Sequence, residues 1–532
     1  MSRFAGTGTL TALALRRDRV MVPAWVATFT LVTAFSAVAS KDIYRSTPEL
    51  RRATEGWNAT TALVAIHGRI YDTSSLGAGS LVKMTGLGTA MVGLLAILLV
   101  IRHTRADEEV GRTELAAGGV VGRYAALTAA LVVASLTVVA LSVLSGLSLV
   151  VGGLPASGAA AFALAWSGAG LVFAGVGACA AQLATTARAA RGLGSAVLAV
   201  TYAVRAFGDT APQGGARWVS WFSPLGWAQQ VRPFAGDRWW ALVAPLFAVP
   251  ALLLVAAALL RHRDLGAGLI TERPGPERGA ALVSPLRLAW RLQQMALVGW
   301  AVGALLMGLL LGSIASTIGE IFDNPTFSRY IQLLGGVHVL EDAFLSTELG
   351  ISAVIVSAFG ISAALRVHSE EAQGRLEPLL AAGVSRTRFA LSHLAVALGG
   401  STVLMLGVGL SVGASHAIAT GDPAQVGRVG AAALVRLPAV WLMTALVIAL
   451  DGVSARLAVL SWVALVAVIV IGEFGPLMEL PDWTLDVSPF THVPSLPGGR
   501  LDAVPLVWLT ALAAALVTFG LAAFRRRDVA PD

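Results

Sequence analysis

The sequence EEAQGRLEPLLAAGVSRTRFA, residues 370–390, decides the fold, because a related stretch, EEVGRTELAAGGVVGRYA, occupies residues 108–125. Each stretch follows one long apolar run and precedes another. Other pairs recur in the same order, about 260 to 275 residues apart, which indicates a duplicated domain and excludes a solenoid unit. These pairs are Leu15-Arg16 with Trp290-Arg291, Ser223-Pro224 with Ser488-Pro489, and Arg261-His262-Arg263-Asp264 with Arg525-Arg526-Arg527-Asp528. We therefore predict two similar halves, residues 1–270 and 285–532, joined by a cytoplasmic linker, residues 271–284.

The composition places the chain in a bilayer. Hydrophobic residues make up 56% of the chain and charged residues 13%, whereas a soluble domain carries about 25% charged residues. The net charge of +7 does not indicate a nucleic-acid partner, because the basic residues cluster at the ends of the apolar runs. The single cysteine, Cys179, excludes a disulfide within the chain.

Runs of about 20 apolar residues can cross the bilayer as helices. Twelve such runs are present, and none has the alternation of barrel strands, so we predict an all-α integral membrane protein with two parallel six-helix repeats related by a pseudo-twofold axis. The fifth and eleventh runs are the shortest. The predicted spans are 20–40, 83–101, 124–150, 157–183, 192–207 and 240–260 in the first half, and 295–317, 349–365, 390–418, 430–450, 457–471 and 503–523 in the second.

The distribution of the 38 Lys and Arg residues predicts the orientation. Placing both termini in the cytoplasm puts most of these residues on the inner side of a plasma membrane. The loop after the first span, with Lys41, Arg45, Arg51 and Arg52, is the main exception. It is long, and long loops influence orientation less than short ones.

Several segments outside the spans have unusual compositions. Residues 10–19 and 285–294 mix apolar residues with Arg and fit either an amphipathic helix in the inner interface or an ordinary charged flank. Residues 218–240 and 475–502 are rich in Trp and Pro, which suits short interfacial pieces near the outer leaflet. Such pieces could form an aromatic belt or an outer gate.

The duplicated stretches at residues 108–125 and 370–390 admit two interpretations. Each begins with paired acids and continues with Gly-Arg, another Glu, a small apolar patch and a further Arg. A single copy would fit a solvated loop with arginines that set the topology. Loops usually vary, so the presence of the motif in both halves favours a docking surface at the inner face.

No sequence motif indicates chemistry within this chain. The phosphate-binding pattern G-x-x-x-x-G-K-[ST] is missing, as are the zinc-protease and nucleophile-elbow patterns. We therefore predict that the chain is not an enzyme by itself and binds no cofactor. If the chain performs uphill work, the energy must come from a partner or from an ion gradient.

At the paired inner stretches the chain resembles the permease subunits of ABC exporters whose halves carry E-x-x-G-x-x-E-x-L-L-x-x-x-V-S-R after the second span. Residues 371–386, EAQGRLEPLLAAGVSR, match this pattern. The first copy is taken to be one residue shorter between Glu109 and Gly111, and it has Val121-Gly122-Arg123 in place of Val-Ser-Arg. Among such permeases, the fused twelve-span form resembles actinobacterial exporters of polyketide-type antibiotics.

The resemblance implies that two copies of a separate ATP-binding subunit, with their ATP and Mg, dock on the inner face and drive alternating access. The implied docking residues are Glu108, Glu109, Gly111, Arg112, Glu114 and Arg123 in the first half, and Glu370, Glu371, Gly374, Arg375, Glu377 and Arg386 in the second.

The resemblance also implies a central cavity lined by the second and fifth helices of each half. Its candidate lining residues are Met84, Met91, Tyr202, Arg205, Ile351, Phe359 and Trp462. Met and aromatic side chains suit a hydrophobic small-molecule cargo, and they suit plain helix packing equally. The expected function is export of hydrophobic drugs or antibiotics. The alternatives are an ion-coupled secondary transporter, whose repeats often have inverted topology, and a membrane enzyme or scaffold acting on lipid or cell-envelope precursors.

Overall fold

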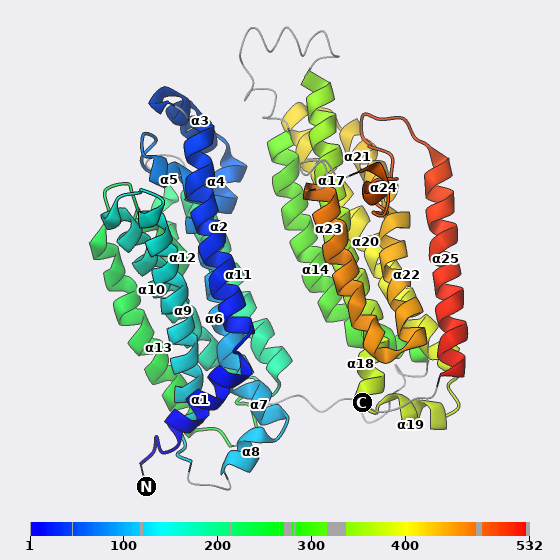
Figure 1. The fold of residues 1–532 in the computed structure, drawn as a ribbon, viewed down its shortest axis with the longest axis horizontal. Helices are drawn as coiled ribbons and strands as arrows, with labels where there is room; N and C mark the ends of the chain where they lie inside the picture. The colour runs from blue at the N-terminus through cyan, green and yellow to red at the C-terminus, as the bar shows by residue number, and fades with distance from the viewer. Residues whose placement is uncertain are drawn as a thin grey trace. The chain divides into compact units, whose positions relative to one another are not determined.

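The computed structural model describes residues 2–44, 46–117, 121–211, 215–264, 266–270, 279, 284–315, 337–474 and 481–527. Across these ranges the regular secondary structure is entirely helical (Figure 1). The chain divides into two compact units, Met1–Gly275 and Pro276–Asp532. Most of the predicted linker, residues 271–284, lies outside the described residues.

The first unit contains long helices and, at one end, a group of short ones (Figure 1). Its elements are α1 Thr7–Arg17, α2 Met21–Ile43, α3 Thr47–Ala59, α4 Thr61–His67, α5 Leu76–Ser80, the π-helix η1 Met84–Gly88, α6 Thr89–Arg102, α7 Arg105–Glu109, α8 Arg112–Ala117, α9 Ala125–Val151, α10 Ala156–Leu183, α11 Ala187–Thr210, the 3-10 helix η2 Ala216–Phe222, α12 Pro224–Gln230, the 3-10 helix η3 Trp239–Leu242 and α13 Val243–Arg261.

The second unit repeats the long helices. Its described elements are α14 Pro285–Ala315, α17 Val337–Ala364, α18 Arg366–Ala372, α19 Leu376–Ala381, α20 Arg386–Thr420, α21 Ala424–Leu434, α22 Leu437–Val453, the 3-10 helix η5 Ala455–Val459, α23 Leu460–Phe474, α24 Asp482–Leu485 and α25 Ala503–Arg526.

Ten helical stretches among the described residues are long and apolar enough to cross a membrane, and they match ten of the twelve predicted spans. The chain is therefore a multi-pass membrane protein. The fifth predicted span lies in α11, whose Arg188, Arg191, Arg205 and Asp209 make it a more polar helix. The eleventh lies in η5 and α23, where the apolar helix Ala455–Ile469 is shorter than a usual span. Twelve spans therefore remain a prediction.

The long helices of the two units pack in the same order. Helix α2 packs on α9 as α14 packs on α20, and α10 packs on α13 as α22 packs on α25. Each unit has its own core, built around Phe162 and Trp166 in the first and around Phe359, Phe389 and Met405 in the second. Buried aromatic side chains of this size supply much of the dispersion that holds helices together when lipid surrounds them.

The two units differ where each chain enters its first long helix. In the first unit α1 ends at Arg17, and a turn through Asp18 separates it from α2, as expected for a separate interfacial helix. In the second unit residues 285–294 continue without a break into α14, so the prediction of a separate helix there is not met. The fourth long helix differs in the opposite sense, because α10 is continuous and its counterpart is divided into α21 and α22 at Val435.

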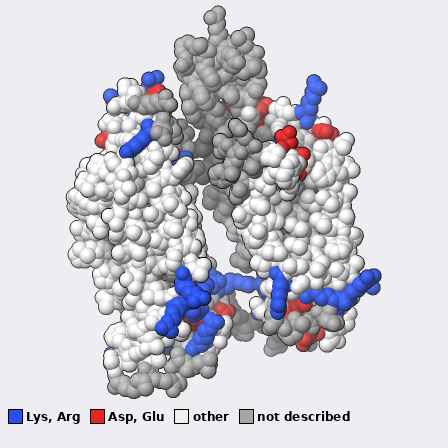
Figure 2. Space-filling view, in the orientation of Figure 1, with Lys and Arg blue, Asp and Glu red and all other residues white. Residues whose placement is uncertain are grey.

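On the surface, charge gathers at the ends of each unit (Figure 2). On the face shown in Figure 2, Lys and Arg gather at the end of each unit that carries α7 or α18, and the middle is almost uncharged. The Trp-rich segment 218–240 forms the short elements η2, α12 and η3 at the opposite end of the first unit (Figure 1). There Trp218 and Trp240 are exposed, as the interfacial interpretation predicts.

Candidate functional site

A buried cluster of charges forms where α7 meets the end of α13. Glu108 lies in α7, and both of its carboxylate oxygens accept hydrogen bonds from Arg263, at 2.8 and 2.9 Å. Arg105 Nη1 lies 3.0 Å from Glu108 Oε2, and the backbone N–H of Gly266 donates to Oε1 at 2.7 Å. Arg105 and Glu108 are buried, so these partners offset the cost of removing both charges from water. We call Arg105, Glu108 and Arg263 the Glu108 cluster.

Arg123 links the start of α9 to the C-terminus of α13. Arg123 Nη2 donates to the carbonyls of Leu260 and Arg261, both at 3.0 Å, and to that of Arg263 at 3.3 Å. The last carbonyls of a helix lack partners within the helix and carry the negative end of its dipole, so a guanidinium is a favourable cap. The segment from α7 to the start of α9 is thus anchored to the C-terminus of α13 at both of its ends.

The second unit builds the matching arrangement at the end of α25. Arg527 Nη2 donates to Glu371 Oε2 at 2.6 Å, and Glu371 is buried. Arg386, at the start of α20, donates to the carbonyl of Arg527. Arg386 thus corresponds to Arg123, and Arg527 to Arg263. We call Glu371, Arg386 and Arg527 the Glu371 cluster.

These contacts change the register in which the two sequence motifs correspond. Glu108 occupies the place of Glu371 and not that of Glu370, and Asp107 occupies the place of Glu370. Asp107 pairs with Arg112 at 3.0 Å, as Glu370 pairs with Arg375 at 3.3 Å. With this register Gly111 aligns with Gly374. The prediction that the first copy is one residue shorter before its glycine is therefore wrong.

The aligned glycines explain the turn that both copies make. Gly111 has φ 73° and Gly374 has φ 67°, values that favour glycine over residues with a side chain. Each turn lets the short helix α7 or α18 be followed at once by α8 or α19 (Figure 1). The glycine of the Gly-Arg dipeptide in both motifs is therefore a structural requirement of this helix–turn–helix segment.

The predicted docking residues separate into buried anchors and exposed side chains. Glu108, Glu370 and Glu371 are buried, so they hold the segment in place and offer little surface to a partner. Glu109 is exposed, and its Oε2 accepts from the backbone N–H of Ala187 at the start of α11, at 3.1 Å. The exposed side chains that remain at the turn are Arg112, Glu114, Arg375 and Glu377.

Sequence reasoning missed three functional residues of this site, Asp107, Arg263 and Arg527. The arginine clusters after the last span of each half were noticed, but only as charged ends. The available signal was their repetition, because each half has two adjacent acids before Gly-Arg, Asp107-Glu108 and Glu370-Glu371, and an arginine after its last helix.

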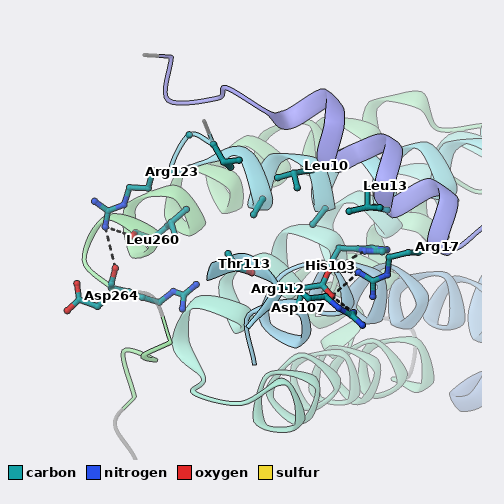
Figure 3. Close-up of a pocket in the computed structure, with 17 residues that line it drawn as sticks. Leu10, Leu13, Arg17, His103, Asp107, Arg112, Thr113, Arg123, Leu260 and Asp264 are labelled. Atoms are coloured by element: carbon teal, nitrogen blue, oxygen red, sulfur yellow. Dashed lines mark hydrogen bonds and ion pairs between the residues drawn. The ribbon is translucent and has the colours of Figure 1, made fainter. Parts of the chain in front are cut away.

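Helix α1 is linked to the same segment in the first unit. Asp18 is fully buried and pairs with His103 at 2.6 Å and with Arg102 at 3.0 Å, while Arg17 pairs with Asp107 at 2.7 Å. A cavity of about 490 Å³ lies beneath α1. Figure 3 shows Leu10 and Leu13 of α1 on one side of it, with Arg17 and Arg112 converging on Asp107.

The predicted cavity residues occupy different environments within their own units. Met91, Ile351 and Trp462 are exposed, while Met84 and Tyr202 are half-buried. Phe359 is buried against Trp300 in the core of the second unit, so the structure places it in helix packing. Arg205 is also buried, and it donates to the carbonyls of Ala65 and Ile66 and pairs with Asp209 at 3.6 Å.

Comparison with known proteins agrees with this architecture. Residues 282–525 match the family described as "Multidrug efflux system permease Rv1217c, C-terminal domain". The whole chain is similar to "Multidrug efflux system permease protein Rv1217c" of Mycobacterium tuberculosis strain H37Rv. The two are 42% identical over 536 residues, which cover 99% of this chain and 96% of the relative. At this identity and coverage, the chain belongs to the family of multidrug efflux system permeases, and it is a transporter subunit and not an enzyme.

Proposed function

We propose that this chain is the membrane-spanning permease of an ATP-driven exporter, and that two copies of a separate ATP-binding subunit dock on α7–α8 and α18–α19. The similarity along the whole chain to a multidrug efflux system permease carries this proposal. The matched Glu108 and Glu371 clusters support it, because they give each unit the same anchored helix–turn–helix at the same end.

The geometry suits transmission of force from a docked partner. Arg112, Glu114, Arg375 and Glu377 are exposed and available for ion pairs with a soluble subunit. A push on either turn would pass through the buried glutamate–arginine pair to the C-terminus of α13 or α25. A buried, charge-assisted contact is suited to this task because it cannot slide without leaving a charge unpaired.

Orientation and cargo follow from the same proposal. The ends that carry α7 and α18 face the cytoplasm of the cell that makes the protein, so both termini are cytoplasmic and the short elements η2, α12 and α24 lie near the outer leaflet. The cargo is a hydrophobic small molecule, drugs and polyketide-type antibiotics being the expected classes. ATP and Mg belong to the partner subunits.

Capture of the ATP-binding subunit by the purified permease tests the docking surface. The double variant Glu114→Lys with Glu377→Lys reverses one exposed charge on each turn and leaves both buried clusters intact. We expect it to lose most of the captured ATPase activity while keeping the thermal stability of the wild type. Glu55→Lys on α3, an equally exposed charge at the other end of the first unit, is the matched control.

Two outcomes contradict the proposal. Undiminished capture by the double variant would show that the turns are not the docking surface. Cargo movement in proteoliposomes driven by a proton or sodium gradient, with no ATP-binding subunit added, would favour the ion-coupled transporter.

A further inference from the structure

A second cavity, of about 400 Å³, lies at the end of the first unit opposite α7 and α8 (Figure 1). Four separate elements converge on it: the connection between α4 and α5, the C-terminus of α11, η2, and the segment from α12 to η3. Its charged and aromatic lining consists of Arg69, Tyr71, Asp209, Arg217, Trp218, Trp221, Arg232, Arg238 and Trp240. Its size is in the range of small-molecule sites.

The charge of this cavity is not balanced by the residues around it. Four arginines line it against one carboxylate, and that carboxylate, Asp209, is already paired with Arg205. Among the described residues none of the four arginines makes a salt bridge. Clustered cations without counter-charges repel one another, so the arrangement costs free energy unless an anion enters.

The arginines are held in fixed positions by contacts that leave donors free. Arg69 and Arg217 each use Nε to bond a backbone carbonyl, that of Asp209 at 3.1 Å and that of Ala211 at 3.0 Å. The terminal nitrogens of Arg69 and Arg217 make no hydrogen bond with any other described residue. A guanidinium oriented in this way presents a planar pair of N–H donors that fits two oxygens of a phosphate.

Arg232 is positioned by an aromatic ring. Its guanidinium carbon lies 4.0 Å from the centre of the Tyr71 ring, and its Nη2 donates to Gln230 Oε1 at 3.4 Å. Its Nε is buried and has no hydrogen-bond partner. Burial lowers the pKa of Arg232 and raises the pKa of Tyr71 to about 12.

The rim of the cavity is apolar and faces outward. Trp221 and Trp240 stack with their ring centres 5.1 Å apart, and Trp218 and Trp240 are exposed. Phe222, next to them in η2, is exposed as well. Exposed tryptophans at the end of a membrane-spanning unit mark the level of the lipid headgroups.

We propose that this cavity binds the phosphodiester head of an anionic glycerophospholipid from the leaflet at that end of the unit. Arg69, Arg217 and Arg232 bind the phosphate oxygens, and the acyl chains lie against Trp218 and Phe222. A free inorganic anion would use the arginines but leave the aromatic rim without a role. The proposal does not depend on ATPase docking.

The second unit lacks the central arginine of this site. After Ser223-Pro224 the next proline, Pro233, follows Arg232. After Ser488-Pro489 the next two prolines, Pro494 and Pro497, follow Val493 and Leu496, so neither is preceded by an arginine. Lipid bound merely as part of the annulus would not distinguish the two units. The proposal therefore predicts one tight lipid of this kind for each chain.

The test measures binding of defined lipids to the full-length purified chain. Phosphatidylglycerol is titrated into the protein in detergent, and the bound lipid is counted by native mass spectrometry. We expect one tightly bound molecule per chain and a rise in the midpoint of thermal unfolding. Phosphatidylcholine with the same acyl chains and inorganic phosphate are the comparison ligands. Arg217→Gln with Arg232→Gln should weaken phosphatidylglycerol binding at least tenfold, whereas Arg51→Gln with Arg52→Gln on exposed α3 should leave it unchanged.

Arg232→Lys keeps the charge and loses the planar pair of donors. It is the variant for the same binding measurement if the double variant does not fold. It should weaken binding several-fold and preserve the unfolding midpoint without lipid. Equal binding of phosphatidylcholine, an equal effect of inorganic phosphate alone, or wild-type affinity in the variants would each overturn the proposal.

Discussion

The Glu108 and Glu371 clusters each anchor a turn, but the two glutamates make different numbers of contacts. Glu108 has two buried arginines and a backbone N–H, and it makes a two-pronged contact with Arg263. Glu371 has one arginine, Arg527, which reaches it through a single nitrogen. Both units therefore have a glutamate–arginine pair that anchors the turn, while the number of bonds that support it differs.

The difference extends to the helix that precedes each bundle. In the first unit Asp18 ties α1 to the end of α6 through Arg102 and His103. The matching position in the second unit is Gln293, which bonds His393 at 3.1 Å. The charged contact that Asp18 makes in the first unit therefore has a neutral counterpart at Gln293 in the second. We therefore expect the first segment to be the stiffer of the two.

The largest effect should come from the buried glutamates themselves. Removing one partner of a buried ion pair costs about 3–5 kcal/mol, because the other charge remains buried and unpaired. Glu108→Gln strands two arginines and should lie at the upper end of this range, with Glu371→Gln at the lower end. Unfolding of the purified chain in a denaturing detergent titration measures both values. Equal losses of stability for Glu108→Gln and Glu371→Gln would show that the extra bonds of Glu108 do not stabilise the fold. Glu377→Gln, at an exposed site, is the control.

Close helix packing near the second cluster gives the next largest difference. A Cβ on Gly452 of α22 would lie 2.2 Å from the backbone carbonyl oxygen of Gly520 in α25, so the helices must separate. A Cβ on Gly175 of α10 would lie 2.8 Å from the Cβ of Leu252 in α13, a milder overlap that a smaller shift of the helices relieves. Gly452→Ala should destabilise by about 3 kcal/mol and Gly175→Ala by about 1 kcal/mol. The same detergent titration measures both losses of stability. A smaller loss for Gly452→Ala than for Gly175→Ala would contradict this prediction.

The tie between α1 and α6 should have an intermediate effect. Asp18→Asn removes the charge from a buried carboxylate that bonds Arg102 and His103, and hydrogen bonds to charged groups contribute about 1.5–3 kcal/mol each. We expect a loss of about 2 kcal/mol, together with faster proteolysis of the turn that follows α1. Gln293→Ala should cost about 1 kcal/mol in the second unit, since its bond to His393 is neutral. A larger loss for Gln293→Ala would reverse the assignment of the stiffer segment.

The smallest effects should come from the exposed arginines of the two turns. The side chains of Arg112 and Arg375 are 58% and 55% exposed, and each pairs with one acid. Surface ion pairs contribute less than about 1 kcal/mol, so Arg112→Gln and Arg375→Gln should both stay within about 0.5 kcal/mol of the wild type. Their effect on capture of the ATP-binding subunit should exceed their effect on the unfolding midpoint. A strong loss of stability in either variant would show that the turn depends on its outer pair.

Hydropathy located the long helices well because length and apolar content alone decide whether a segment can cross a bilayer. Ten of the predicted spans coincide with described helices that meet both conditions. The polar helix α11 and the short helix α23 were the doubtful cases for the same reason, since each fails one of the two conditions. No hydropathy argument could show that α10 is continuous while its counterpart is divided at Val435.

The candidate site was predicted correctly in position and wrongly in register. Matching Glu108-Glu109 to Glu370-Glu371 aligned identical letters, whereas the ion pairs align Asp107-Glu108 with Glu370-Glu371. The spacing to Gly-Arg already contained the correct register, because Glu108 and Glu371 each lie three residues before the glycine. What the spacing did not contain is the arginine partner of each acid, which lies more than 150 residues away. The second cavity could not be found from the sequence, since its arginines come from three segments that are far apart in the chain.

Each of the two clusters closes entirely within its own unit, because Arg263 and Arg527 end the same half that supplies their glutamate partners. A gene split between codons 271 and 284 would therefore cut none of the bonds in either cluster. The halves could in principle be produced as two polypeptides and assembled afterwards. If half-size ancestral proteins worked as paired copies and were later joined end to end, each half would still contain all the residues of its own cluster.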